Sequence, residues 1–190
     1  EIRDLKHHPI RFKSFIMRQL IIFILCVAGF ALTLSAQEKV EIQKLKASHR
    51  TVYTDIIIDA TPQQVWAVLT DTENFSSWGT FLTDIKGTIC DSCEIDAIFQ
   101  LNPSKEKFQA VHHTIAVEEG KEFRWSEKFV GGILDNHVFR VESTADGNTR
   151  FIQSDMTKGG LTWLLGKTFI KLEVENYPIF NRALKAEVEK

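Results

Sequence analysis

The sequence predicts an α+β domain in which a curved antiparallel sheet of about seven strands wraps around a long C-terminal helix. Residues 83–157 alternate short apolar runs with turn residues, which is typical of an antiparallel meander. Beyond Gly159-Gly160 the spacing of apolar residues becomes helical. The sheet has one apolar face and the long helix has another. Both faces are buried only when the sheet closes around the helix.

Residues 1–36 have the features of an upstream extension followed by an export signal. The run from Leu20 to Leu34 contains fifteen residues without a charge, and small residues Ser35-Ala36 follow it. A membrane-spanning helix needs about 20 apolar residues, so this run fits a cleaved signal better. We therefore expect a periplasmic or extracellular protein. The alternative is an uncleaved single-pass anchor, in which case the leader would be the contact with the membrane.

The first elements of the domain follow this leader. Residues 37–50 are polar without a clean period and are expected to form a linker, so that the ligand-binding domain covers 51–190. A β-branched, apolar strand is expected at 52–59. The segment Thr61-Pro62-Gln63-Gln64 forms a capping box with proline in the first helical position, which predicts that a helix begins there. A second short helix is expected over 72–81.

Six more strands and one helix complete the expected order. The strands are expected at 83–90, 93–101, 107–117, 122–130, 136–144 and 149–157, with the clearest hairpin turn at Asp146-Gly147-Asn148. The final helix carries an apolar stripe that includes Phe169, Tyr177, Phe180, Leu184 and Val188. Pro178 is expected to kink or divide this helix, because proline removes one amide donor. Trp66, Trp78 and the stripe are expected to serve mainly as core.

Composition and charge exclude several classes of function. A chain of 190 residues with 44% hydrophobic and 25% charged residues is typical of a globular protein. After residue 36, 18 Lys and Arg stand against 23 Asp and Glu, a net charge of −5. No nucleic-acid partner is expected, because such binders cluster cations on one face. The sequence has no cofactor fingerprint and no metal-ligand cluster, so neither a cofactor nor a metal is expected.

Cys90 and Cys93 flank an expected turn between two strands. In an oxidising compartment such a pair can close a small local disulfide. Two inert thiols or a redox-active pair are the alternatives. A zinc site would need two further ligands at suitable spacing, and the neighbouring sequence offers none.

Seven segments, taken in order, carry a family resemblance: Ala60–Trp66 with Leu69–Asp71, Phe75–Phe81, Phe123–Trp125, His137–Val141, Asp146–Phe151, Gly159–Leu161 and Asn181–Lys185. In this order the sequence resembles the START-related superfamily, often called SRPBCC, and most of all its polyketide cyclase/dehydrase branch. The resemblance implies a helix-grip (START-like) fold with a deep apolar cavity. It implies no particular reaction, because members of the superfamily include lipid carriers, hormone receptors and aromatic cyclases.

Strand alternation selects the residues that are expected to face this cavity. The facing of 149–157 depends on the length of the preceding turn, since a slip of one residue reverses every side chain. The resemblance at Thr149-Arg150-Phe151 favours Phe151, Gln153 and Asp155 on the inside. The expected ligand-binding residues are Trp125, Phe129, His137, Phe139, Val141, Phe151 and Gln153.

The expected function is the binding or carriage of a hydrophobic small molecule or lipid, because burial of apolar surface alone supports micromolar affinity. The first alternative is a cyclase, dehydratase or hydrolase in which His137 is the general acid or base and Asp155 or Glu127 orients it. In the competing structural interpretation, His137 is an inner histidine that is satisfied by its neighbours. The second alternative is an envelope interaction domain with no ligand. The sequence indicates neither the identity of the ligand nor an oligomeric state.

Overall fold

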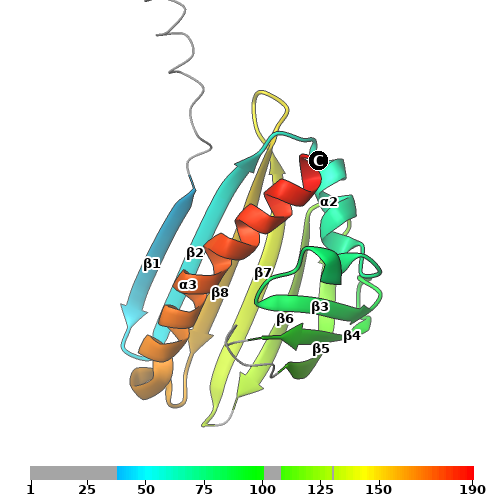
Figure 1. The fold of residues 1–190 in the computed structure, drawn as a ribbon. Coiled ribbons are helices and arrows are strands. Elements are labelled where there is room, and N and C mark those ends of the chain that lie inside the picture. The colour runs from blue at the N-terminus through cyan, green and yellow to red at the C-terminus, as the bar shows by residue number, and fades with distance from the viewer. Residues whose placement is uncertain (1–37, 101–107, 130) are drawn as a thin grey trace, which may run out of the picture. The chain divides into compact units, whose positions relative to one another are not determined.

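A computed structural model describes residues 38–100, 108–129 and 131–190. An eight-stranded antiparallel sheet, in the order β1-β2-β8-β7-β6-β5-β4-β3, curves around one long helix (Figure 1). The strands are β1 (Lys39–Lys46), β2 (His49–Ile58), β3 (Leu82–Gly87), β4 (Glu94–Phe99), β5 (Gln109–Glu118), β6 (Glu122–Phe129), β7 (Ile133–Ser143) and β8 (Thr149–Lys158). The helices are α2 (Pro62–Thr70), the 3₁₀ turn η1 (Phe75–Ser77) and α3 (Thr162–Val188). The expected α+β helix-grip fold is confirmed.

The expected export signal falls outside the described residues. Within the described part of the chain, none of the helices has the length and apolar character needed to cross a membrane.

Residues 39–46 form the edge strand β1, so the linker expected at 37–50 is wrong. The strand pairs with β2 in antiparallel register, and β2 begins at His49 within the same segment. Val40 and Ile42 remain 42% and 50% exposed, because an edge strand has one neighbour and little to cover it. Edge strands commonly carry charges that discourage further pairing, which removes the apolar alternation by which strands are recognised in a sequence.

The helix after β2 begins as expected, whereas the second helix is reduced to one turn. Gln64 donates its backbone N–H to Thr61 Oγ1 at 3.4 Å, and Gln64 Oε1 accepts the Thr61 N–H at 3.0 Å, which completes the capping box. The helix expected over 72–81 is present only as η1. A side chain at Gly79 would place Cβ 2.7 Å from the Leu82 carbonyl oxygen, so the chain turns tightly into β3 instead of continuing a helix.

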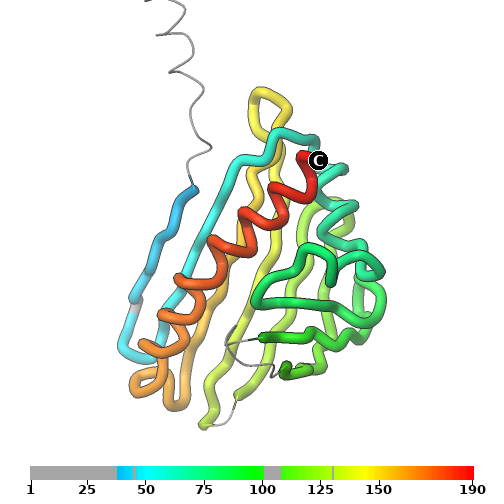
Figure 2. The backbone as a smooth tube through the Cα atoms, viewed as in Figure 1, coloured from blue at the N-terminus to red at the C-terminus, as the bar shows by residue number. Residues whose placement is uncertain are grey.

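Helix α3 runs without interruption from Thr162 to Val188, so the division expected at Pro178 does not occur. The helix crosses β2 and β8 diagonally and brings its C-terminal end beside α2 (Figure 2). Its start is fixed by backbone contact between two turns. A Cβ at Gly160 would lie 2.0 Å from the Gly131 carbonyl oxygen, and Leu161 N donates to that oxygen at 3.0 Å.

The hairpin between β7 and β8 sets which side chains of β8 face α3. Gly147 N donates to Thr144 O at 3.1 Å, and Ser143 pairs with Thr149 across the hairpin. In this register Phe151 faces α3, where its ring centroid lies 6.3 Å from that of Phe180. The expected inward facing of Phe151, Gln153 and Asp155 is confirmed, since all three are buried.

The interior around Phe180 is densely filled with aromatic rings, and we refer to it as the packed half. The Phe180 centroid lies 5.3 Å from that of Trp78 and 5.7 Å from that of Phe139. The ring centroids of Phe75 and Trp78 lie 4.4 Å apart, so η1 and the residue after it contribute two rings that pack against Phe180. The same core includes Trp66, as expected.

Candidate functional site

A cavity of about 310 Å³ lies between the sheet and residues 169–177 of α3. Its volume is at the lower end of the range for small-molecule pockets. Six aromatic residues and two aliphatic residues form the apolar wall: Phe81, Phe99, Trp125, Phe129, Phe169, Tyr177, Val111 and Leu172. The polar residues of the lining are Gln109, His113, Glu127, Asp135, His137, Asp155, Glu173 and Asn176. The expected internal cavity is therefore present, with more ionisable groups than the sequence indicated.

The expected site residues divide into two groups. Trp125, Phe129 and His137 line the cavity, as do the candidate carboxylates Glu127 and Asp155. The others lie beside it in the core and are at most 4% exposed: Phe139, Val141, Phe151 and Gln153. Phe139 and Phe151 pack against Phe180 in the packed half, and Val141 belongs to the same core. Gln153 lies behind the cavity wall, where it bonds to His137. The role of these four residues in binding a ligand remains a prediction.

Strand register brings the ionisable groups together. His137 is paired with Trp125 of β6 on one side and with Asp155 of β8 on the other. Asp135, two residues earlier on the same face of β7, is paired with Glu127. From the opposite wall, α3 contributes Glu173 and, one helical turn later, Tyr177. The Tyr177 hydroxyl donates to Asp155 Oδ2 at 2.6 Å, which ties the helix to the sheet at the cavity.

Three of the carboxyl groups that line the cavity, Glu127, Asp135 and Glu173, have raised pKa values. Burial first, and then the negative charge of Asp155, raises the pKa of Asp135 to about 10. The same two causes raise the pKa of Glu173 to about 9. Both side chains therefore hold a proton at neutral pH. Burial also raises the pKa of Glu127.

His137 directs both ring nitrogens at protein groups. Gln153 Nε2 lies 2.9 Å from His137 Nε2, so the amide donates and the ring proton resides on Nδ1. Nδ1 faces Asp155 Oδ2 at 3.6 Å. Burial lowers the pKa of His137 to about 4, which keeps the ring neutral. This geometry favours the interpretation of His137 as an inner histidine satisfied by its neighbours.

His113 on β5 is a site residue that the sequence reasoning missed. Its ring stacks on Trp125 with centroids 4.7 Å apart, and the residue is 4% exposed. Neither ring nitrogen has a hydrogen-bonding partner among the described residues. Burial lowers the pKa of His113 to about 4. Its neighbour His112 points to the opposite face, as expected from alternation, and bonds to Asp96 Oδ1 at 2.9 Å.

Asp135, Glu173 and Tyr177 are among the other site residues that the sequence reasoning missed. Asp135 shares a strand face with His137, but the expected strand began one residue too late to include it. Glu173 lies one helical turn after Phe169 and one before Tyr177, within the apolar stripe of the last helix. An acid at such a position is the signal that would have identified it.

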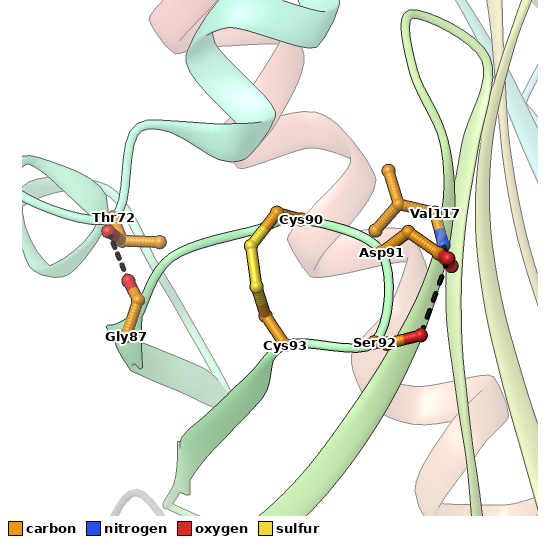
Figure 3. The surroundings of a disulfide bond; sticks show 7 residues. All are labelled: Thr72, Gly87, Cys90, Asp91, Ser92, Cys93 and Val117. Atoms are coloured by element: carbon orange, nitrogen blue, oxygen red, sulfur yellow. Dashed lines mark hydrogen bonds between the residues drawn. A yellow bond between two sulfur atoms is a disulfide. The ribbon is translucent and has the colours of Figure 1, made fainter.

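The cysteine pair lies away from this cavity. The structure joins Cys90 and Cys93 as a disulfide with Cα atoms 5.3 Å apart, between β3 and β4 (Figure 3). Within the loop, Asp91 Oδ1 accepts the Val117 N–H at 3.1 Å, and Ser92 N donates to Ile115 O at 2.9 Å. The bridge therefore closes a turn that docks on β5. None of its residues lines the cavity.

Among the residues that the structure describes, no group of three or more His, Cys, Asp or Glu side chains is arranged to hold a metal ion.

Comparisons with known proteins agree with this architecture. Solved structures with similar folds include a protein from Rhodobacter sphaeroides, at a TM-score of 0.60 and 15% identity over 80% of this chain and 99% of that chain. The Zhui aromatase/cyclase from Streptomyces sp. R1128 has a TM-score of 0.58 and 11% identity, covering 74% of this chain and 94% of that chain. These identities support the fold alone. A search among curated proteins finds no match.

The family model described as polyketide cyclase / dehydrase and lipid transport matches residues 49–189. The match extends from the start of β2 to the end of α3 and includes every described residue that lines the cavity. The resemblance seen in seven short segments is thus confirmed over most of the chain. The protein belongs to the polyketide cyclase/dehydrase and lipid transport family.

Proposed function

We propose that the protein reversibly binds a hydrophobic small molecule in the cavity under α3. The observation that carries this proposal is the volume of about 310 Å³ enclosed by six aromatic side chains. Burial of roughly 300 Å² of apolar ligand surface stabilises a complex by about 7 kcal/mol before association costs. That leaves micromolar affinity within reach without any special polar contact. The family description, which includes lipid transport, supports the same function.

An envelope interaction domain without a ligand is the weaker alternative. That alternative requires an interior filled by the protein's own side chains. The packed half meets this requirement, but the interior beside residues 169–177 does not.

A cavity-filling variant tests the proposal. Leu172 lines the cavity from α3, so Leu172→Trp should occupy the space that a guest needs. We expect it to weaken binding of the neutral fluorescent probe N-phenyl-1-naphthylamine by at least about tenfold. Leu164→Trp is the matched control, because Leu164 is 57% exposed on the same helix. Equal probe affinity for the wild type and Leu172→Trp, with both folded by circular dichroism, would show that the cavity is not the binding site.

The natural ligand can be sought directly. Native mass spectrometry of the protein purified from its host should show an adduct of a hydrophobic molecule, and solvent extraction should release it. The Leu172→Trp variant, purified in the same way, should lack the adduct. An adduct retained in full by this variant would locate the molecule elsewhere on the protein.

A cyclase or dehydratase is the second candidate, and the protonated carboxyl groups favour it. Asp135 and Glu173 hold protons at neutral pH, so either can act as a general acid toward a ligand carbonyl or a departing hydroxyl group. His137 is less suited to this role, because Gln153 occupies the ring nitrogen that does not face Asp155. If the protein is a dehydratase, incubation with the extracted ligand should yield a product lighter by one water. Asp135→Asn or Glu173→Gln should abolish that product while binding is retained.

We further propose that the protein works outside the cytoplasm. The proposal rests on the sequence of residues 1–36 and is supported by the Cys90–Cys93 disulfide, which persists in oxidising compartments. Fractionation of host cells, with an intact-mass measurement, should find a protein shortened near residue 36 in the exported fraction. A full-length protein in the membrane fraction would support the anchored alternative, and a reduced, full-length protein in the cytoplasm would contradict export.

A further inference from the structure

We infer that the ligand of this cavity is a protonated amine on an apolar body, which makes the site selective for cations. This inference rests on the proposed binding function and names its ligand class. It is argued from the charge of the lining, from its aromatic surfaces and from buried acceptors that have no donor.

The described residues that line the cavity include four carboxylic acids and no lysine or arginine to balance them. Carboxyl groups reach the cavity from four elements, namely Glu127 on β6, Asp135 on β7, Asp155 on β8 and Glu173 on α3. The other titratable groups that face them are His113, His137 and Tyr177. No lysine or arginine occurs among the described residues of the lining. An anionic guest such as a fatty-acid carboxylate would therefore meet the negative charge of Asp155 and no lysine or arginine in this poorly solvated lining, which is strongly unfavourable.

The apolar part of the lining also suits a cation. Phe129 on β6 and Phe169 on α3 stack at a centroid distance of 5.7 Å, and so form a continuous aromatic surface between sheet and helix. Trp125 and Tyr177 add two further rings to the same cavity. Aromatic faces attract ammonium groups, and the attraction is larger where water is excluded. The walls can therefore hold both the apolar body and the cationic nitrogen.

Buried acceptors without donors provide an independent indication. His113 is only 4% exposed, and neither ring nitrogen has a partner among the described residues, so its neutral ring offers one unsatisfied acceptor nitrogen beside one N–H donor. Asp155 Oδ1 is likewise buried and has no hydrogen-bonding partner among the described residues apart from the proton that Asp135 holds. Leaving a buried acceptor unsatisfied costs free energy that a guest can recover by donating to it. A protonated amine has N–H donors as well as charge, so it satisfies these acceptors better than an alcohol does.

Proton release follows from the same arrangement. In the empty cavity Asp135 and Glu173 avoid mutual repulsion by keeping their protons. An ammonium group that enters beside them favours the charged form of each carboxyl. Binding of the cation should therefore expel at least part of a proton, and its affinity should rise with pH while the amine remains protonated. A neutral guest of the same size should do neither.

Three probes of equal chain length test the inference by titration calorimetry: octylamine, octanol and octanoate. At about pH 7 we expect octylamine to bind at least about tenfold more tightly than octanol, and octanoate to bind more weakly than either. Titration in buffers of different ionisation enthalpy should show proton release with octylamine alone. The affinity of octylamine should increase between about pH 6 and about pH 9, below the ordinary pKa of a primary amine.

Variants assign the effect to the cavity carboxyls. Asp135→Asn and Glu173→Gln should each lower octylamine affinity by about tenfold and reduce proton release, while octanol affinity stays within about twofold. Glu175→Gln is the control, because Glu175 lies on the same helix but is exposed and pairs with Lys171 at 3.8 Å. It should change none of these values.

The outcomes separate this inference from the proposed function. If octanol and N-phenyl-1-naphthylamine bind but octylamine shows no preference over octanol, the cation inference is overturned and the hydrophobic site stands. If octylamine and both neutral probes all fail to bind, both proposals fall. A preference for octylamine that survives both Asp135→Asn and Glu173→Gln would also overturn the inference, because the cavity carboxyls would not be its cause.

Discussion

The two halves of the interior beneath α3 share one helix and the same strands, yet one is filled and the other is hollow. In the packed half, Phe180 meets Trp78, which directly follows η1, and Phe139 from β7 at centroid distances of 5.3 Å and 5.7 Å. In the cavity half, Glu173 and Tyr177 of α3 and Asp135 and Asp155 of the sheet line an open volume of about 310 Å³. The difference shows that packing and binding are separated along a single helix.

The contrast arises from what the chain supplies on each side. Over the packed half, Phe75 of η1 and the following Trp78 pack their rings against Phe180. At the cavity, the lining includes carboxyl groups that cannot be packed against each other without protons. One half therefore provides stability, whereas the other leaves buried polar groups that a guest can satisfy.

The largest expected effect is the loss of stability when a ring is removed from the packed half. Phe180→Ala should lower the free energy of unfolding by about 3–5 kcal/mol, because it removes a fully buried ring that contacts several others. Phe169→Ala is the comparison, since Phe169 lines the cavity and is only partly buried. It should cost less than about 2 kcal/mol in a denaturant titration. Equal losses for the two variants would contradict the division into two halves.

The next largest expected effect is a pH dependence of the free energy of unfolding that arises in the cavity half. The folded pKa of Asp135 lies above the ordinary value, so the stability associated with its proton is present below about pH 4 and is lost progressively toward about pH 10. Asn carries no such proton and keeps a donor near Asp155. Asp135→Asn should therefore be more stable than the wild type by roughly 1–3 kcal/mol at about pH 8, with little difference near about pH 4.

Thermal or urea unfolding as a function of pH checks this expectation. Glu175→Gln should follow the wild-type profile, because Glu175 is exposed. A gap between Asp135→Asn and the wild type that stays constant with pH would mean that ionisation of Asp135 is not its origin.

The smallest expected effect concerns a region that belongs to neither half. Removing the Cys90–Cys93 bridge with Cys90→Ala and Cys93→Ala should cost about 2 kcal/mol, since a loop this short loses little chain entropy when closed. The affinity for N-phenyl-1-naphthylamine should not change, because the bridge does not line the cavity. A large loss of probe binding at full folding would show that the turn supports the site.

Local signals made much of the fold predictable from the sequence. The capping box at Thr61 to Gln64 placed α2, and turn chemistry at Asp146-Gly147-Asn148 placed the β7–β8 hairpin. Strand β1 could not be predicted in this way, because an edge strand buries too little to leave an apolar pattern. The length of the second helix was overestimated, because the backbone turns tightly at Gly79, where a Cβ would lie 2.7 Å from the Leu82 carbonyl oxygen.

The site was predictable only on the strands. Alternation identified Trp125, Phe129 and His137 as lining residues, but it also selected Phe139 and Val141, which lie under the packed half. Period-two patterns give the face of a strand, not the position along it where the opposing helix leaves a space. The helical contribution, Glu173 and Tyr177, depends on the rotation and position of α3, which no local pattern determines.

Pro178 lies on α3 between Tyr177, which lines the cavity, and Phe180, which anchors the core. Because proline has no amide hydrogen, the helix lacks one backbone hydrogen bond at this junction, namely the one that the carbonyl of Val174 would otherwise accept. Fraying of the turns above the cavity therefore need not spread to the turns above the aromatic core. Amide hydrogens on the two sides of the proline should accordingly exchange with solvent through separate opening events.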